Sequence, residues 1–100
     1  MNKYIKTDIE QALILLKSAI NNALSDIENG VETSIELGKH VPFSYIIECA
    51  EQRGWIEDQI KNGWECDAWY YMLTPNCKSV CIEGYLFKGL STKIYIDNNL

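Results

Sequence analysis

The sequence is poor in the residues from which most catalytic and metal sites are built. Among its 100 residues there is one histidine, His40, and none of the four cysteines is paired as Cys-x-x-Cys. Zinc knuckles depend on such pairs, and the intervals between these cysteines are sixteen, ten and three residues. No Gly-x-Gly-x-x-Gly, phosphate-binding loop, His-Glu-x-x-His or nucleophile elbow occurs. We therefore expect a non-enzymatic protein that uses no metal and no cofactor.

Long hydrophobic runs are also missing. The longest, Ala12–Leu16, has five residues, whereas a membrane-spanning helix needs about 20. The first eleven residues carry charges throughout, which does not fit the apolar core of a secretory signal. We therefore expect a cytoplasmic protein with no membrane contact, whose cysteines are reduced.

Positive charge is scarce. Nine lysines and arginines oppose fourteen acids, and ten of these acids lie between Asp26 and Asp67 beside only three bases. Affinity for a nucleic-acid backbone comes mainly from Lys and Arg, so direct nucleic-acid binding is not expected. The net charge of −5 instead fits a protein partner with a basic surface, because opposite potentials speed encounter. Acidity also simply keeps proteins soluble, and both interpretations stay open.

What the sequence does contain begins with a long amphipathic helix. The capping box Thr7-Asp8-Ile9-Glu10 predicts its start, and Gly30 predicts its end. Apolar residues recur between them at spacings of three and four, which places them on one face. They are Ile9, Ala12, Leu13, Leu16, Ala19, Ile20, Ala23, Leu24 and Ile27. Ile14 falls outside this stripe and is expected to be exposed.

The remaining elements are mostly strands. Val31–Leu37 alternates apolar and polar residues and predicts a strand, and Pro42–Arg53, followed by Gly54, predicts a second helix. Residues 55–63 fit either a helical turn or a loop. Three further strands are predicted: Trp64–Leu73, Ser79–Phe87 and Leu90–Ile96. The order α-β-α-β-β-β predicts a single α+β domain over residues 1–100, a small antiparallel sheet with two helices packed on one face.

The strand Trp64–Leu73 carries two tryptophans and two tyrosines, and strand geometry divides its side chains between two faces. The uncharged set fits the core beneath the helices: Trp64, Cys66, Ala68, Tyr70 and Met72. The other set mixes acids with aromatics: Glu65, Asp67, Trp69, Tyr71 and Leu73. Trp and Tyr are residue types that dominate interface hot spots, so this second face is the candidate contact surface.

The predicted partner-binding residues are the acids and aromatics of this second face, together with two acids that would form its rim. They are Glu65, Asp67, Trp69 and Tyr71, with Glu57 and Asp58 as the rim. The alternative is structural. Trp69 and Tyr71 would then cover the second face of the sheet against loop 55–63, with Trp55 and Ile56 packed over them.

The acid-rich middle, Asp26 to Asp67, and the aromatic stretch Trp64-Glu65-Cys66-Asp67-Ala68-Trp69-Tyr70-Tyr71 carry a resemblance. In size, acidity and style the chain resembles small cytosolic inhibitors of phages and mobile elements, such as anti-CRISPR and other anti-defence proteins, and toxin-immunity proteins. Those groups share a strategy rather than a fold: a compact domain blocks a nuclease or a nucleic-acid groove, often with carboxylates standing where phosphates would. The resemblance implies inhibition or neutralisation of a bacterial nucleic-acid-binding protein or nuclease.

Two other functions stay open. A nucleotide or another small ligand stacked on the aromatic face would need cations for its phosphates, and the candidates are Lys78, Lys88 and Lys93. A small metal-dependent enzyme would use Glu65 and Asp67, whose side chains share a strand face about 7 Å apart. The sequence also leaves open whether two copies of the chain associate.

Overall fold

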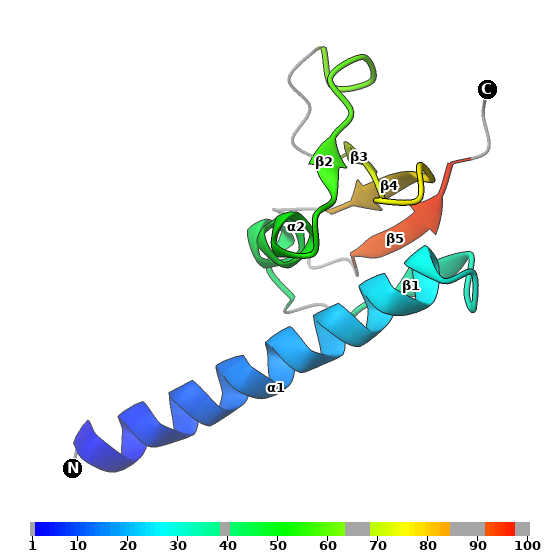
Figure 1. Ribbon diagram of the computed structural model, residues 1–100. Helices are drawn as coiled ribbons and strands as arrows, with labels where there is room; N and C mark the ends of the chain where they lie inside the picture. Colours follow the sequence, from blue (N-terminus) through cyan, green and yellow to red (C-terminus); the bar gives the residue numbers. More distant parts are fainter. Residues whose placement is uncertain (1, 39–40, 64–68, 85–91, 98–100) are drawn as a thin grey trace.

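The computed structural model describes residues 2–38, 41–63, 69–84 and 92–97, with side chains from Glu10 onward. Its elements are α1 (Asn2–Glu28), β1 (Ser34–Glu36), α2 (Phe43–Gln52), β2 (Ile56–Glu57), β3 (Trp69–Leu73), β4 (Ser79–Glu83) and β5 (Lys93–Ile96), shown in Figure 1. The strands form one antiparallel sheet in the order β1-β5-β4-β3-β2. The predicted α+β class is therefore confirmed.

Helix α1 begins earlier than the capping box predicts. It starts at Asn2, so Thr7 lies inside the helix and the predicted start is wrong. Residues 3–6 include neither glycine nor proline, and a helix extends readily once it is nucleated, so the hydroxyl at position 7 does not set the boundary. The predicted end is right, because Gly30 adopts a φ of 75° directly after the last turn.

The second helix also ends as predicted, at Gly54 with a φ of 90°. The segment after it contains a two-residue strand, β2, where the sequence allowed only a helical turn or a loop. Ile56 pairs with Leu73 and Glu57 with Met72. Within the described residues the sheet therefore has five strands, one more than predicted.

Both helices contribute to one core against the same face of the sheet (Figure 1). Its buried members are Ile20, Ala23, Leu24, Ile27, Ile46, Cys49, Ala50, Trp55, Met72, Val80, Ile82 and Ile94. Met72 is fully buried and Tyr70 packs against this core, so the predicted assignment of these two residues to the helix-covered face is confirmed. Trp64, Cys66 and Ala68, predicted on the same face, lie outside the described residues.

The stripe on α1 is only partly covered. Ile20, Leu24 and Ile27 are buried, whereas Leu13 and Leu16 are half-buried and Ala12 is exposed. Figure 1 shows the reason: the N-terminal half of the helix extends beyond the sheet and α2. Within the described residues, neither helix combines the length and apolarity that a membrane span requires.

Candidate functional site

The corner between α2 and β2 is fixed by one tryptophan. After Gly54 the chain reverses, and the Trp55 N–H donates to the Ala50 carbonyl over 3.0 Å. The indole ring is buried in the core, and its Nε1 donates to the Glu28 carboxylate at 2.8 Å. Arg53 binds the same carboxylate at 3.3 Å. The corner is thus attached to the last turn of α1, and this attachment positions β2 at the edge of the sheet.

The short strand β2 sends its two side chains to opposite faces. Ile56 lies opposite Leu73 on the face away from the helices and is 61% exposed. Glu57 lies opposite Met72 on the helix side. The turn that follows is closed by the Asp58 carboxylate, which accepts the backbone N–H groups of residues 60 and 61, and it leaves Ile60 94% exposed at its tip.

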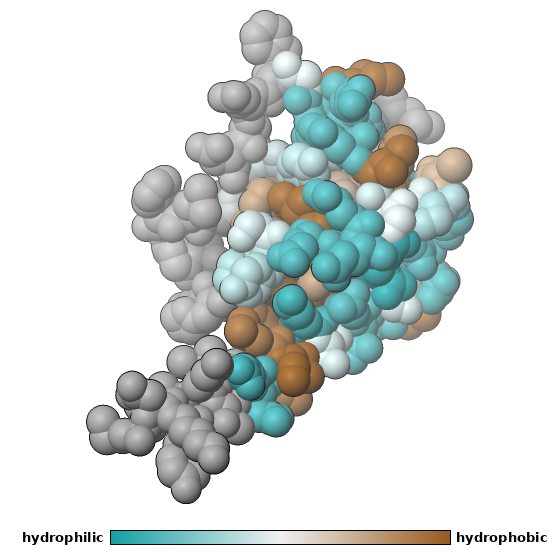
Figure 2. Space-filling model, turned by 60° about the vertical axis from the view of Figure 1, so that its left-hand side comes forward, coloured by the Kyte–Doolittle hydropathy of each residue, from teal (hydrophilic) through white to brown (hydrophobic). Residues whose placement is uncertain are grey.

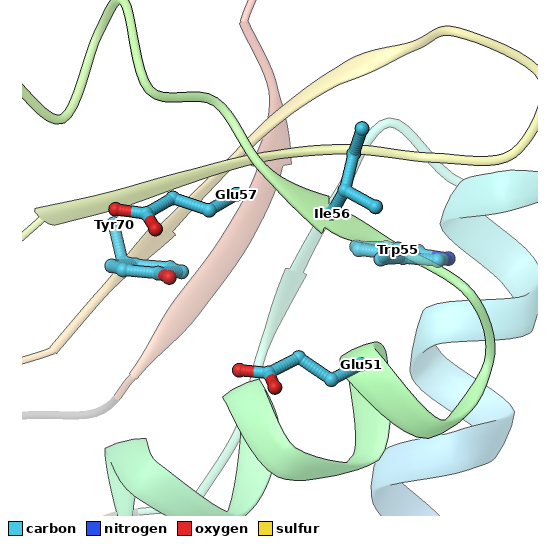
Figure 3. A pocket seen from close by; sticks show the side chains of 5 residues that line it. All are labelled: Glu51, Trp55, Ile56, Glu57 and Tyr70. Carbon is cyan, nitrogen blue, oxygen red and sulfur yellow. The ribbon is translucent and has the colours of Figure 1, made fainter.

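A pocket lies between α2 and this edge. It has a volume of about 350 Å³ and is lined by Glu51, Trp55, Ile56, Glu57 and Tyr70. Figure 3 shows the Glu57 carboxylate beside the Tyr70 ring, with Glu51 reaching from α2 toward the same gap. The Trp55 nitrogen points the other way, toward Glu28. The pocket therefore combines two carboxylates with two aromatic walls.

The pocket is lined by two solvent-exposed carboxylates and no basic residue. Neither Glu51 nor Glu57 forms an ion pair with any side chain in the described part of the chain. Burial raises the pKa of the Tyr70 hydroxyl, and the charges of Glu57 and then Glu51 raise it further. The hydroxyl therefore remains neutral, while both carboxylates are available to a cation. The Tyr70 ring itself is held edge-on against Phe43, with ring centroids 6.4 Å apart.

The opposite face of the sheet is partly closed by the turn that follows β2. Lys61 lies over the Tyr71 ring, 5.2 Å from its centroid, and pairs with Asp97. The Asn62 side chain accepts the Tyr71 N–H and donates to its carbonyl. The structural alternative, in which loop 55–63 covers this face, is right for Tyr71, which Lys61 and Asn62 of that loop contact. Its detail is wrong, because Trp55 lies in the core and Ile56 is exposed.

We call the face of the sheet away from the helices its outer face. Cys81 lies fully buried on this face, paired with Tyr71 on one side and with Tyr95 on the other. Burial raises the pKa of its thiol, against smaller lowering effects of hydrogen bonds with Tyr95 and Tyr71. The hydrogen bond with Cys81 and burial also raise the pKa of Tyr95. A buried, protonated thiol is a poor nucleophile. No metal-ligating group of three His, Cys, Asp or Glu side chains occurs among the described residues.

The predicted contact residues thus fall on two surfaces. The prediction that Glu57 forms the rim of the face carrying Trp69 and Tyr71 is wrong, because Glu57 lies on the helix side of the sheet. Glu57 lines the pocket, and Trp69 is 42% exposed on the outer face, where its Nε1 donates to Glu83. Tyr71 is half-buried beneath Lys61, and the Asp58 carboxylate is occupied within its turn. The other two predicted residues, Glu65 and Asp67, lie outside the described residues.

Of the five pocket residues, only Glu57 was a predicted contact residue, and Glu51, Trp55, Ile56 and Tyr70 were missed. Strand alternation assigned Tyr70 to the core, and its side chain does lie on the helix-covered face. Because β3 is next to the short edge strand β2, however, the Tyr70 ring also reaches the pocket. Glu51 is in the last turn of α2. Its position three residues before Gly54 is the one signal that it lies near the corner where the chain turns back.

Comparison with known proteins finds no family model, no curated protein and no solved structure that matches this chain.

Proposed function

We propose that the chain is a small acidic, non-enzymatic binding protein. Its target is a bacterial nucleic-acid-binding protein or nuclease, which it inhibits or neutralises by occupying a basic surface, as anti-defence and immunity proteins do. The observation that carries the proposal is the pocket at the β2 edge, where Glu51 and Glu57, without a cation partner among the described residues, flank the ring of Tyr70.

Surfaces that bind nucleic acid are rich in lysine and arginine, and the pocket suits both side chains. A carboxylate binds a guanidinium through paired hydrogen bonds, and an aromatic ring attracts a cation placed over its face. Two such carboxylates would stand where phosphates of the nucleic acid otherwise bind. The target's own basic residues would thereby be neutralised.

Exposed apolar side chains of β2, of the turn after it and of β3 would supply anchors for the same partner. Ile56 and Ile60 are 61% and 94% exposed, and Trp69 is 42% exposed on the face of the sheet away from the helices. Interfaces draw most of their affinity from a few such residues surrounded by polar groups. Glu65 and Asp67 stay predicted members of this surface.

The proposal requires a reducing, cytoplasmic location, because a nuclease or a defence complex acts inside the cell. Cys49, Cys77 and Cys81 are free thiols, as expected of proteins in such a compartment. In an oxidising compartment the exposed thiol of Cys77 would be open to oxidation.

Affinity capture from a bacterial lysate tests the proposal. The wild type is expected to retain a protein with a basic surface, and Glu51→Gln/Glu57→Gln to lose it. The matched control is Glu32→Gln/Glu36→Gln, which removes two exposed acids, one in β1 and one just before it, at the opposite edge of the sheet. Adding the wild-type chain should also reduce nucleic-acid binding by the captured protein. Equal retention by both double variants would exclude the pocket as the contact.

The alternative of a nucleotide-binding protein has less support. Lys78 donates to the Ile27 and Glu28 carbonyls at the end of α1, so its ammonium group already stabilises a helix terminus. Lys93 is exposed on β5, and Lys88 lies outside the described residues. Lys93 shares a cross-strand row with Trp69, but Glu83 lies between them, binds the Trp69 Nε1–H and would repel a phosphate.

A further inference from the structure

The ammonium group of Lys61 has a defined position on the outer face of the sheet. It pairs with the Asp97 carboxylate, donates to Ser79 Oγ at 3.1 Å and lies 5.2 Å from the centroid of the Tyr71 ring. An ammonium group has three N–H donors, and an aromatic ring attracts a cation placed over its face. A carboxylate, a hydroxyl and a ring therefore converge on this single charge.

The three groups that receive the ammonium belong to the sheet. Tyr71 lies on β3 and Ser79 begins β4, and these two strands pair directly. Asp97 follows β5, where its backbone N–H donates to the Ser79 carbonyl over 2.9 Å. The register of the sheet therefore fixes all three groups, and only the lysine comes from the turn after β2. Removal of the Lys61 side chain would leave the rest of the site in place.

The lysine itself comes from an exposed segment. Residues 59–61 are exposed, and Ile60 is 94% exposed. Figure 2 shows apolar surface among hydrophilic surface at the top of the molecule, the height at which Figure 1 places this turn. Hydrogen bonds of the Asp58 and Asn62 side chains hold the turn without the Lys61 side chain. An ion pair open to water contributes little to stability, so the Lys61 side chain can rotate away at little cost.

We propose that Tyr71, Ser79 and Asp97 form a binding site for a lysine side chain of a basic partner, and that Lys61 fills this site in the free chain. The chain's own lysine presents the same functional group as the proposed ligand. The Asp97 side chain is 10% exposed, and a charge shielded from water is costly without a counter-charge. Withdrawal of Lys61 therefore favours a second ammonium group in the same place.

The site suits lysine better than arginine. An ammonium group is a compact point charge, whereas a guanidinium is a planar fork that binds carboxylates through paired hydrogen bonds. Here one carboxylate oxygen of Asp97 and the hydroxyl oxygen of Ser79 both meet a single nitrogen, Nζ of Lys61. That arrangement matches a point charge.

Lys61 would act as an internal competitor for this site. Because the turn tethers it, its effective concentration at the site is on the order of millimolar. A single free lysine would then not displace it, but a partner with further contacts would. Exposed Trp69 on the same face and Ile60 at the tip of the turn offer such contacts. The part played by a partner's lysine rests on the proposed function, whereas the ammonium site does not.

A titration of the full chain carrying Lys61→Ala tests the site. The probe is n-propylammonium, which is the part of the lysine side chain that the substitution removes, and the ring resonances of Tyr71 are the readout. We expect a saturable shift in Lys61→Ala and none in the wild type at the same concentrations. Lys93→Ala, which removes a lysine exposed on the same face, should behave as the wild type. Lys61→Ala/Asp97→Asn should lose the shift, and neutral n-propanol should cause none.

Several results would overturn the site or its ligand. The absence of a saturable shift in Lys61→Ala, or an equal shift in Lys61→Ala/Asp97→Asn, would overturn the ammonium site. Tighter binding of ethylguanidinium, the corresponding part of arginine, would overturn the choice of lysine.

The partner's use of the site is tested separately. Lys61→Ala should retain the captured protein at higher salt than the wild type does, because the internal competitor is gone, and retention only at equal or lower salt would exclude a partner's lysine from the site. A chain that binds n-propylammonium but captures no protein would overturn the proposed function and leave the ammonium site standing.

Discussion

The indole N–H of Trp55 donates to Oε1 of Glu28 over 2.8 Å, across 27 residues of sequence. The indole ring is 1% exposed, so water has little access to its nitrogen. Because Trp55 directly precedes β2, this hydrogen bond connects the end of α1 to the edge that carries the pocket. Stability and the shape of the candidate site therefore depend on the same carboxylate.

Glu28→Ala should consequently destabilise the chain. The buried indole N–H loses its acceptor, and an unsatisfied buried donor costs about 1–3 kcal/mol in the free energy of unfolding. Urea denaturation followed by tryptophan fluorescence measures this loss. Glu32→Ala removes an exposed acid four residues further along, and such surface changes stay within about 0.5 kcal/mol. If the two variants unfold alike, the hydrogen bond contributes nothing to stability.

The boundaries that local chemistry sets were predictable. Gly30 and Gly54 end the two helices with positive φ, a conformation that few other residues adopt. Strand β2 was not predictable, because its two residues have no periodicity of their own. They are extended only because Trp55 holds the corner and β3 offers an edge. The predicted start of α1 was wrong for a related reason: a capping sequence allows a helix to begin but does not require it.

The candidate site was predictable only in part. The sequence placed Trp69 and Tyr71 on one strand face, which the register confirms. It assigned Glu57 to the rim of that face, whereas Glu57 lies opposite Met72 on the helix side of the sheet. It could not show that Glu51 and Glu57 line the same pocket, because their separation depends on how the chain turns between α2 and β2. It also could not show that Lys61, rather than Trp55, would lie over Tyr71.

Asn62→Ala should loosen the turn after β2. The Asn62 side chain makes two hydrogen bonds with the Tyr71 backbone, at 2.6 and 3.1 Å. Their loss is expected to lower the free energy of unfolding by about 1–2 kcal/mol and to speed hydrogen exchange at the Tyr71 amide. Gln59→Ala, an exposed position in the same turn, is the control. Unchanged hydrogen exchange at the Tyr71 amide in Asn62→Ala would show that the edge of the sheet does not depend on the hydrogen bonds of this turn.

Stability should fall at alkaline pH. Cys81 and Tyr95 keep their protons in the folded chain above their ordinary pKa values of 9.0 and 10.0. Above pH 9 the unfolded chain therefore binds fewer protons than the folded one, so the free energy of unfolding decreases as pH rises. Below these ordinary pKa values the two protonated groups contribute fully to the free energy of unfolding.

The urea midpoint measured from neutral pH upward gives this slope. Cys81→Ala removes a thiol with a raised pKa and also the hydrogen bond that most raises the pKa of Tyr95, so its slope should be shallower. Cys77→Ser, which changes an exposed thiol, should leave the slope of the wild type. Equal slopes for the wild type and Cys81→Ala would contradict the buried pair as the cause.

Gly84→Ala should destabilise the chain and also disturb the pocket. A Cβ at this buried glycine would lie 2.6 Å from a ring carbon of Phe43, and relief of such overlap in a packed core costs about 1–3 kcal/mol. Phe43 packs edge-on against Tyr70, so a displaced Phe43 ring shifts a wall of the pocket. Urea denaturation and the ring resonances of Tyr70 measure the two effects. Gly38→Ala is the matched control, because its Cβ would meet no atom within 4 Å. A Gly84→Ala chain as stable as this control, with unshifted Tyr70 resonances, would show that Phe43 has room to move and does not set the pocket.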